Sequence, residues 1–137
     1  FHQPKIFQIH SIQYPFYLIN WKEALHTHSR TMNNKWLMEQ QGENILWINS
    51  STAGSLGVVD GDVVWVENQY AKAKAKAKVT ERIRPDVVGM IHGFGHWGFG
   101  ATAKNKGIND SQFLSGKAER LSGMARHKEC AVRVYKA

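Results

Sequence analysis

The chain has 137 residues, of which 42% are hydrophobic and 21% charged, and this size and composition suit one compact domain. Its formal net charge of +7 favours partners that carry phosphate or another anionic surface. One cysteine, Cys130, excludes an internal disulfide framework and a cysteine-rich metal cluster, and no apolar run approaches the roughly 20 residues of a membrane span.

Residues 1–13 are mixed in character and contain Pro4, which suits a linker or an interdomain arm. The chain starts with Phe1 rather than methionine, so we expect a piece of a longer protein with its domain at residues 14–137.

The first predicted strand lies at residues 14–19, where bulky apolar side chains follow one another. The polar run 20–34 lacks the apolar periodicity of a core helix, so we predict a long loop there. Long loops inside compact domains usually carry function.

A short helix is predicted to end at Gln41, with Asn33 or Asn34 as its N-cap. We expect Trp36 and Leu37 to face the core from this helix.

Residues 45–48 form the next predicted strand. A turn of helix should follow, capped by Ser50 or Ser51 and closed by Gly57, because glycine adopts the left-handed conformation common at helix ends.

Two further strands are predicted at residues 63–66, after an Asp60-Gly61 turn, and at 71–79. Alanine and lysine alternate in the second of these, and a strand sends alternate side chains to opposite faces. We therefore expect one buried alanine face and one solvated lysine face.

The last predicted strands are residues 87–91 and 130–135, with Cys130 as a small buried hydrophobe rather than a nucleophile. Strands separated by short helical turns favour a small, mainly β barrel over a doubly wound sheet.

The loop 20–34 offers basic, imidazole and hydroxyl groups, a mixture that fixes a diphosphate better than charge alone. A solvated surface loop is the competing interpretation. His26 and His28 could also ligate a metal in a barrel enzyme, but the next carboxylate, Glu39, lies well beyond them.

The glycine-rich segment 92–100 is the second candidate, since His92 and His96 among glycines could contact a flat heterocycle. The alternative is a barrel corner with Phe94, Trp97 and Phe99 in the core.

The lysine face could bind nucleic acid, but its sequence has no interleaved aromatic residues for stacking, so we expect no nucleic-acid partner. No nucleophile with its base, acid–base pair or metal shell is recognisable, so no catalytic or metal-ligating residues are assigned.

Taken in order, several blocks of the chain resemble the molybdopterin dinucleotide-binding domain that ends enzymes of the dimethyl sulfoxide reductase superfamily. The blocks are residues 14–20 with 26–33, 48–64, 77–88, 107–109 and 128–134. The sequence His92-Gly93-Phe94-Gly95-His96 is most similar to the polysulfide, thiosulfate, tetrathionate and arsenate reductase branch.

This resemblance implies a double-psi β-barrel, which is a closed six-stranded barrel, and a bis(molybdopterin guanine dinucleotide) ligand carrying molybdenum or tungsten. The cofactor would perform the redox chemistry while the protein orients it and compensates its charge. The residues implied to meet it are Asn20, Trp21, Lys22, His28, Ser29, Arg30, Thr31, His92, Gly93, His96, Asn109 and Lys128.

The resemblance also implies that catalysis needs domains outside this chain, including any iron–sulfur cluster. The implied partners are those remaining domains and, in the respiratory branch, iron–sulfur and membrane-anchor subunits. That branch would place the protein in the periplasm or at a membrane, without direct insertion of this domain.

Overall fold

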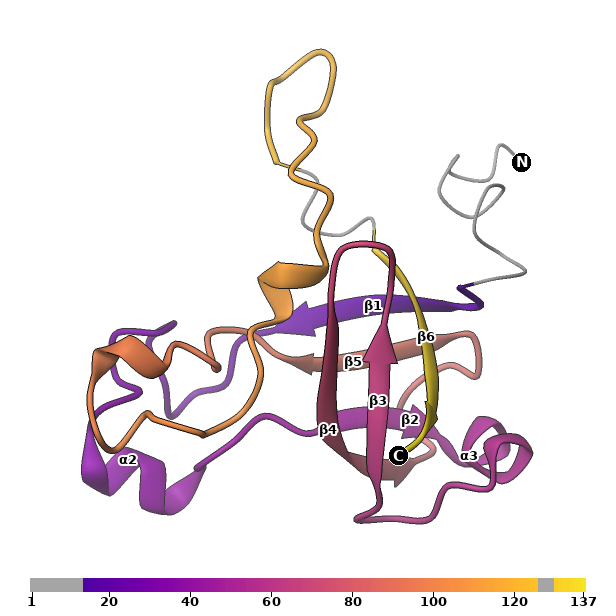
Figure 1. Cartoon of the computed structure of the whole chain (residues 1–137), viewed down its shortest axis with the longest axis horizontal. Helices are drawn as coiled ribbons and strands as arrows, with labels where there is room; N and C mark the ends of the chain where they lie inside the picture. Colours follow the sequence, from indigo (N-terminus) through magenta and orange to yellow (C-terminus); the bar gives the residue numbers. More distant parts are fainter. Residues whose placement is uncertain (1–13, 126–129) are drawn as a thin grey trace.

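The computed structural model describes residues 14–125 and 130–137, and within them six strands close into a barrel (Figure 1). The order around the barrel is β1-β5-β2-β4-β3-β6. The strands are β1 (Phe16–Trp21), β2 (Leu46–Asn49), β3 (Val63–Glu67), β4 (Lys72–Thr80), β5 (Val87–Ile91) and β6 (Ala131–Lys136). The helical elements are α2 (Lys35–Gln40), α3 (Ser50–Leu56), η1 (Trp97–Phe99) and η2 (Asp110–Phe113). The predicted closed, mainly β architecture is confirmed.

Two parallel strand pairs, β1 with β5 and β2 with β4, are joined by antiparallel pairings into the closed sheet. Because β1 and β5 run in the same direction, the segments that leave them start at the same end of the barrel (Figure 1). The backbone N–H of His92 donates to the carbonyl of Trp21 at 2.8 Å just beyond this pair. The topology therefore brings together the two segments that the sequence singled out.

Strand β4 shows the expected alternation, with Ala75 and Ala77 buried and the lysines exposed. The barrel interior is filled from the facing strands by aliphatic side chains such as Val64, Val88 and Val132, all fully buried. Burying side chains of this size stabilises the fold by about 1.5–3 kcal/mol each. The period-two pattern thus located the core correctly.

The short helix α2 is capped as predicted by Asn34, whose side-chain oxygen accepts from the N–H groups of Trp36 and Leu37. The prediction that Trp36 faces the core is wrong, since its side chain is 77% exposed. Met38 is the buried residue of this helix instead. The apolar residues of this helix are consecutive, and none has an apolar partner three or four positions away within the helix, so the sequence could not decide which face turns inward.

The cap of helix α3 also differs from the prediction. Asn49, rather than Ser50 or Ser51, accepts a hydrogen bond from the N–H of Ser51 and opens the helix. Gly57 closes the helix with φ of 68°, as predicted. Asn49 was overlooked because it also ends β2, and its amide donates to the carbonyl of Ile83 at 2.7 Å.

A smaller apolar cluster lies outside the barrel interior, beneath the loop that follows β1. Met32 from that loop packs with Met38, Ile91, Phe94 and Ala103. This packing holds the loop against the end of β5 and gives it a fixed base.

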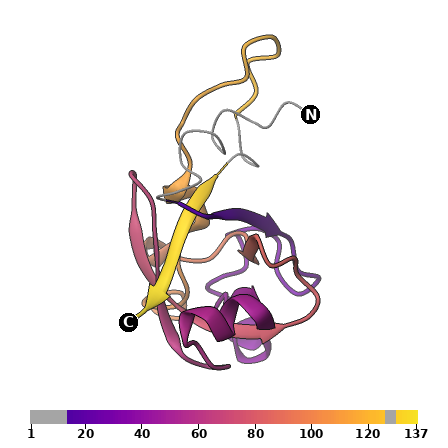
Figure 2. The same ribbon diagram turned by 90° about the vertical axis from the view of Figure 1, so that its right-hand side faces the viewer.

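A segment that precedes β6 projects from the barrel in both views (Figures 1 and 2). Its residues 118 and 125 form an isolated antiparallel bridge, and Leu121 between them is 94% exposed. In residues 14–125 and 130–137, none of the helices has the length and apolar character needed to cross a bilayer.

Candidate functional site

A buried carboxylate joins the ends of β1 and β5. Asp110 is 2% exposed, accepts a hydrogen bond from the Asn20 amide at 2.6 Å, and holds Nδ1 of His92 at 2.9 Å from both of its oxygens. Buried carboxylates are retained when such donors compensate their desolvation. The bridge fixes the position of two predicted site residues, Asn20 in β1 and His92 directly after β5.

His28 lies beside this bridge. Its imidazole stands 5.8 Å from that of His92, with the two rings 86° apart. Its backbone passes so close to Gly93, which has φ of 105°, that a Cβ added there would lie 2.7 Å from the His28 carbonyl carbon. Glycine is therefore needed at position 93 both for its conformation and for the space it leaves.

The electrostatic environment of His28 is cationic. Its pKa is lowered from the ordinary value of 6.5, first by the charge of Lys22 and further by desolvation, His92 and Arg30. Positive groups gathered around an exposed imidazole disfavour one more positive charge and favour an anion. The arrangement fits the diphosphate binding predicted for this loop.

His26 and Thr31 shape the loop from inside. His26 is buried, its Nδ1 lies 3.0 Å from Oγ1 of Thr31, and its Nε2 lies 2.9 Å from the carbonyl of Gln41. Oγ1 of Thr31 also accepts from the N–H of Thr27 at 3.0 Å. Because both nitrogens of His26 bond within the protein, His26 and the exposed His28 do not form the metal-binding pair considered above. In the described part of the chain, no three His, Cys, Asp or Glu side chains converge on a point.

Residues 107–110 form a second wall of the candidate site, next to the segments that follow β1 and β5. Hydrogen bonds from the buried Asn44 hold these residues against the barrel. Its amide nitrogen donates to the carbonyls of Ile91 and Ile108 at 3.0 and 2.9 Å, and its oxygen accepts from the N–H of Ile108 at 2.9 Å. Gly95, with φ of 80°, lies against this wall, and a Cβ there would stand 2.1 Å from the backbone nitrogen of Asn109. The glycine-rich segment thus lets two stretches of backbone touch.

The structure separates the predicted site residues into groups. Those that meet at the shared end of β1 and β5 are Asn20, Lys22, His28, Arg30, His92 and Gly93. Those that lie in the flanking turns are Ser29, Thr31, His96 and Asn109.

Trp21 and Lys128 stand apart from these groups. The ring of Trp21 lies over Gly89 on the sheet, 5.1 Å from the ring of Trp47. Lys128 lies outside the described residues.

Two residues that organise the site, Asp110 and Asn44, were not predicted. Asp110 directly follows the Gly107-Ile108-Asn109 block, so a carboxylate next to a site motif was the available signal. Asn44 immediately precedes an apolar strand, where a polar residue that is buried must find partners.

The alternative interpretation, in which the glycine-rich segment is a barrel corner with its aromatic side chains in the core, holds for Phe94 but not for Trp97. Phe94 is 1% exposed and meets the ring of His26 edge to face at 5.3 Å, whereas Trp97 is 51% exposed. The segment is both a packed corner and a wall of the site.

Comparison with known proteins agrees with this geometry. Residues 16–131 match the family described as "Molydopterin dinucleotide binding domain". The thiosulfate reductase molybdopterin-containing subunit of Salmonella typhimurium is 36% identical over 112 residues, which cover 81% of this chain and 15% of that protein. The arsenate respiratory reductase molybdopterin-containing subunit of Shewanella sp. is 28% identical over 139 residues, covering 90% and 16%.

Among solved structures, acetylene hydratase from Pelobacter acetylenicus superposes with a TM-score of 0.80 at 19% identity, covering 100% of this chain and 21% of that chain. The predicted double-psi β-barrel is thereby confirmed. The chain spans about 15% of the length of the curated relatives described above. With the family match extending over most of its length, the chain belongs to the molybdopterin dinucleotide-binding domain family.

Proposed function

We propose that this domain binds bis(molybdopterin guanine dinucleotide) carrying molybdenum or tungsten, within a longer oxidoreductase. The observation that carries the proposal is the pair of cations, Lys22 and Arg30, that surrounds His28 beside the Asp110 bridge, at the end where β1 and β5 both terminate. When bound, the cofactor supplies metal–dithiolene redox chemistry. The chain's own residues hold and orient it.

The residues present fit a diphosphate. Lys22 and Arg30 supply charge on an exposed loop, where a flexible side chain can follow an anionic group. Gly93 lets the backbone of His28 pack directly against it, which places the exposed imidazole of His28 beside that of His92. The proposed contact set also keeps Asn20, Trp21, Ser29, Thr31, His96, Asn109 and Lys128.

His92 is the residue whose orientation is best defined. The Asp110 carboxylate accepts a hydrogen bond from Nδ1, so Nε2 is the ring nitrogen that remains for a ligand, on a side chain that is 32% exposed. Such a fixed imidazole can accept or donate one hydrogen bond to a pterin edge or a phosphate oxygen.

The similarity to thiosulfate and arsenate reductase subunits supports a place in the branch that contains these enzymes. On that proposal residues 1–13 link the domain to the rest of the enzyme, and catalysis requires those other domains. Iron–sulfur and membrane-anchor subunits would be its partners, at the periplasmic face or at a membrane.

The test uses the longer protein in which this chain occurs, with Lys22→Ala and Arg30→Ala combined. Acid hydrolysis of the purified enzyme should release GMP, and elemental analysis should find molybdenum or tungsten. The double variant is expected to retain less than half of both, while the matched double variant Arg82→Ala with Lys117→Ala, on exposed basic residues outside the proposed contact set, retains the full amount.

Hydrogen exchange on the same samples should show slower exchange in residues 20–34 when cofactor is present. Equal cofactor content in both double variants, or unchanged exchange in that loop, would refute the assignment. Release of CMP instead of GMP would refute the guanine form alone.

A further inference from the structure

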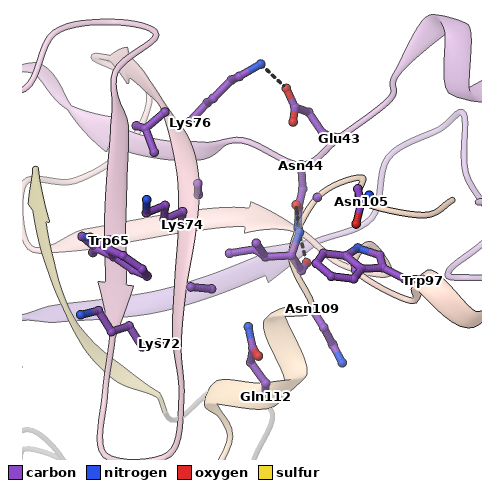
Figure 3. Close-up of a pocket in the computed structure, with 16 residues that line it drawn as sticks. Glu43, Asn44, Trp65, Lys72, Lys74, Lys76, Trp97, Asn105, Asn109 and Gln112 are labelled. Atoms are coloured by element: carbon purple, nitrogen blue, oxygen red, sulfur yellow. Dashed lines mark hydrogen bonds and ion pairs between the residues drawn. The ribbon is translucent and has the colours of Figure 1, made fainter. Parts of the chain in front are cut away.

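A groove of about 670 Å³ lies between the outer face of the β3–β4 hairpin and the segment that runs from Gly95 to Gln112 (Figure 3). Pockets of this size take a small ligand or a short stretch of peptide. We call it the lysine–tryptophan groove, after Lys72, Lys74, Trp65 and Trp97 on its two walls.

The hairpin wall presents ammonium groups arranged over an indole. Nζ of Lys72 and of Lys74 stand 4.2 and 4.8 Å from the centre of the Trp65 ring. Lys72 and Lys74 occupy alternate positions of β4, so their Cα atoms are about 6.6 Å apart, which is the spacing of alternate residues in any extended polypeptide. The wall therefore offers a row of lysines at every second position of an extended strand.

The row is only partly neutralised by the chain itself. Lys76 pairs with Glu43 at 2.7 Å, which raises the pKa of Lys76, and Lys72 lies 3.9 Å from Glu67. Among the described residues Lys74 has no carboxylate partner. An anionic ligand would meet unpaired charge here.

The opposite wall is suited to a peptide backbone. Asn105 and Gln112 carry amide groups, which both donate and accept as backbone groups do, and the half-exposed Trp97 lies on the same wall (Figure 3). An exposed tryptophan on a polar wall commonly anchors an apolar side chain of a binding partner.

We propose that the lysine–tryptophan groove docks an extended acidic segment of a partner protein that carries carboxylates at alternate positions. Its carboxylates would pair with Lys72 and Lys74, its backbone with the opposing amides, and an apolar side chain with Trp97. Charge complementarity is the main argument. Single-stranded nucleic acid is a poorer fit, because bases stack on open ring faces and the ammonium groups of two lysines already lie over Trp65.

The experiment uses this chain and two synthetic peptides of one composition. In the first, glutamate alternates with valine, and in the second the glutamates form one block. Calorimetry should give tighter binding of the alternating peptide, weakened by added salt, and indole NMR signals of Trp65 and Trp97 should shift during the titration.

Lys72→Ala combined with Lys74→Ala should weaken binding of the alternating peptide by about fivefold to tenfold, the sum expected for two partly screened ion pairs. Arg82→Ala with Lys117→Ala, on exposed basic residues that do not line the groove, is the control and should leave affinity unchanged. Lys74→Glu gives an independent readout. This variant should bind the alternating glutamate peptide more weakly, and it should bind a peptide in which lysine alternates with valine more tightly than the parent chain does.

Three results would overturn the proposal. They are equal affinity for the two glutamate peptides, insensitivity to the lysine substitutions, and stronger binding of a single-stranded oligonucleotide or of inorganic phosphate that displaces the peptide. The longer protein in which this chain occurs gives a further check. If it fails to bind the alternating peptide, its own residues cover the groove and no partner docks there.

Discussion

Replacement of Asp110 by asparagine tests whether one buried carboxylate holds the two ends of β1 and β5 in place. The carboxylate accepts from Asn20 at 2.6 Å and from His92 at 2.9 Å, and it is 2% exposed. Hydrogen bonds to a charged group contribute about 1.5–3 kcal/mol each. Asparagine keeps one acceptor and turns an amide N–H toward one of the two donors, so the variant should lose about 2–4 kcal/mol.

Thermal unfolding followed by circular dichroism should therefore show a Tm lower by roughly 6–15 °C, at about 3–4 °C for each kcal/mol in a domain of this size. Nitrogen NMR of the imidazole adds a local readout, because the new amide should donate to Nδ1 of His92 and move the ring proton to Nε2. Asp60→Asn is the matched control, since that carboxylate is exposed and accepts a hydrogen bond from the backbone N–H of Val79. A Tm within two degrees of the parent chain, or an unchanged tautomer of His92, would show that the bridge does not hold the site.

Other substitutions and reagents give sharper local tests. Positive neighbours lower the pKa of His28 below 6.5, so bound inorganic pyrophosphate should raise that pKa. The affinity for pyrophosphate should then increase as the pH falls through the pKa of His28. An NMR titration of His28 that is the same with and without pyrophosphate would contradict this. Without ligand, the same shift makes the unfolded chain bind more protons just below pH 6.5, so stability should rise with pH across that interval. Gly95→Ala places a Cβ 2.1 Å from the Asn109 nitrogen at φ of 80°, so it should lower the free energy of unfolding in urea by at least about 2 kcal/mol. The control Gly54→Ala, in helix α3 with open space around it, should raise that free energy by about 0.5–1 kcal/mol. Similar values for the two variants would refute the close approach at Gly95. Burial raises the pKa of Cys130 to about 12, so iodoacetamide at neutral pH should label it only after unfolding, and rapid labelling of the folded chain would contradict its position.

The strands could be predicted from the sequence because their signals are local. Alternation in 71–79 and the Asp60-Gly61 turn need only neighbouring residues, and each strand was located within two residues of its bounds. The face of helix α2 was not predictable on this basis. Trp36 has the larger side chain, yet Met38 is the residue that packs into the cluster with Met32 and Phe94, and Trp36 is left exposed.

The candidate site divides in the same way. The loop residues and His92 could be proposed from the sequence because charge, imidazole and glycine gather in short segments. Asp110 was missed because its partner Asn20 is 90 positions away, and a hydrogen bond over that distance leaves no periodic trace in the sequence. The closed sheet supplies this information, since it alone determines which distant segments share an end of the barrel.

Asn44 gives the molecule a mechanical property. Its single amide ties the end of β5 and both backbone groups of Ile108 to the start of β2. Opening of the 107–110 wall must then break buried bonds that the barrel shares, so this wall belongs to the same cooperative unfolding unit as the sheet. This wall is already rigid before a ligand binds, so binding costs little conformational entropy for ordering residues 107–110.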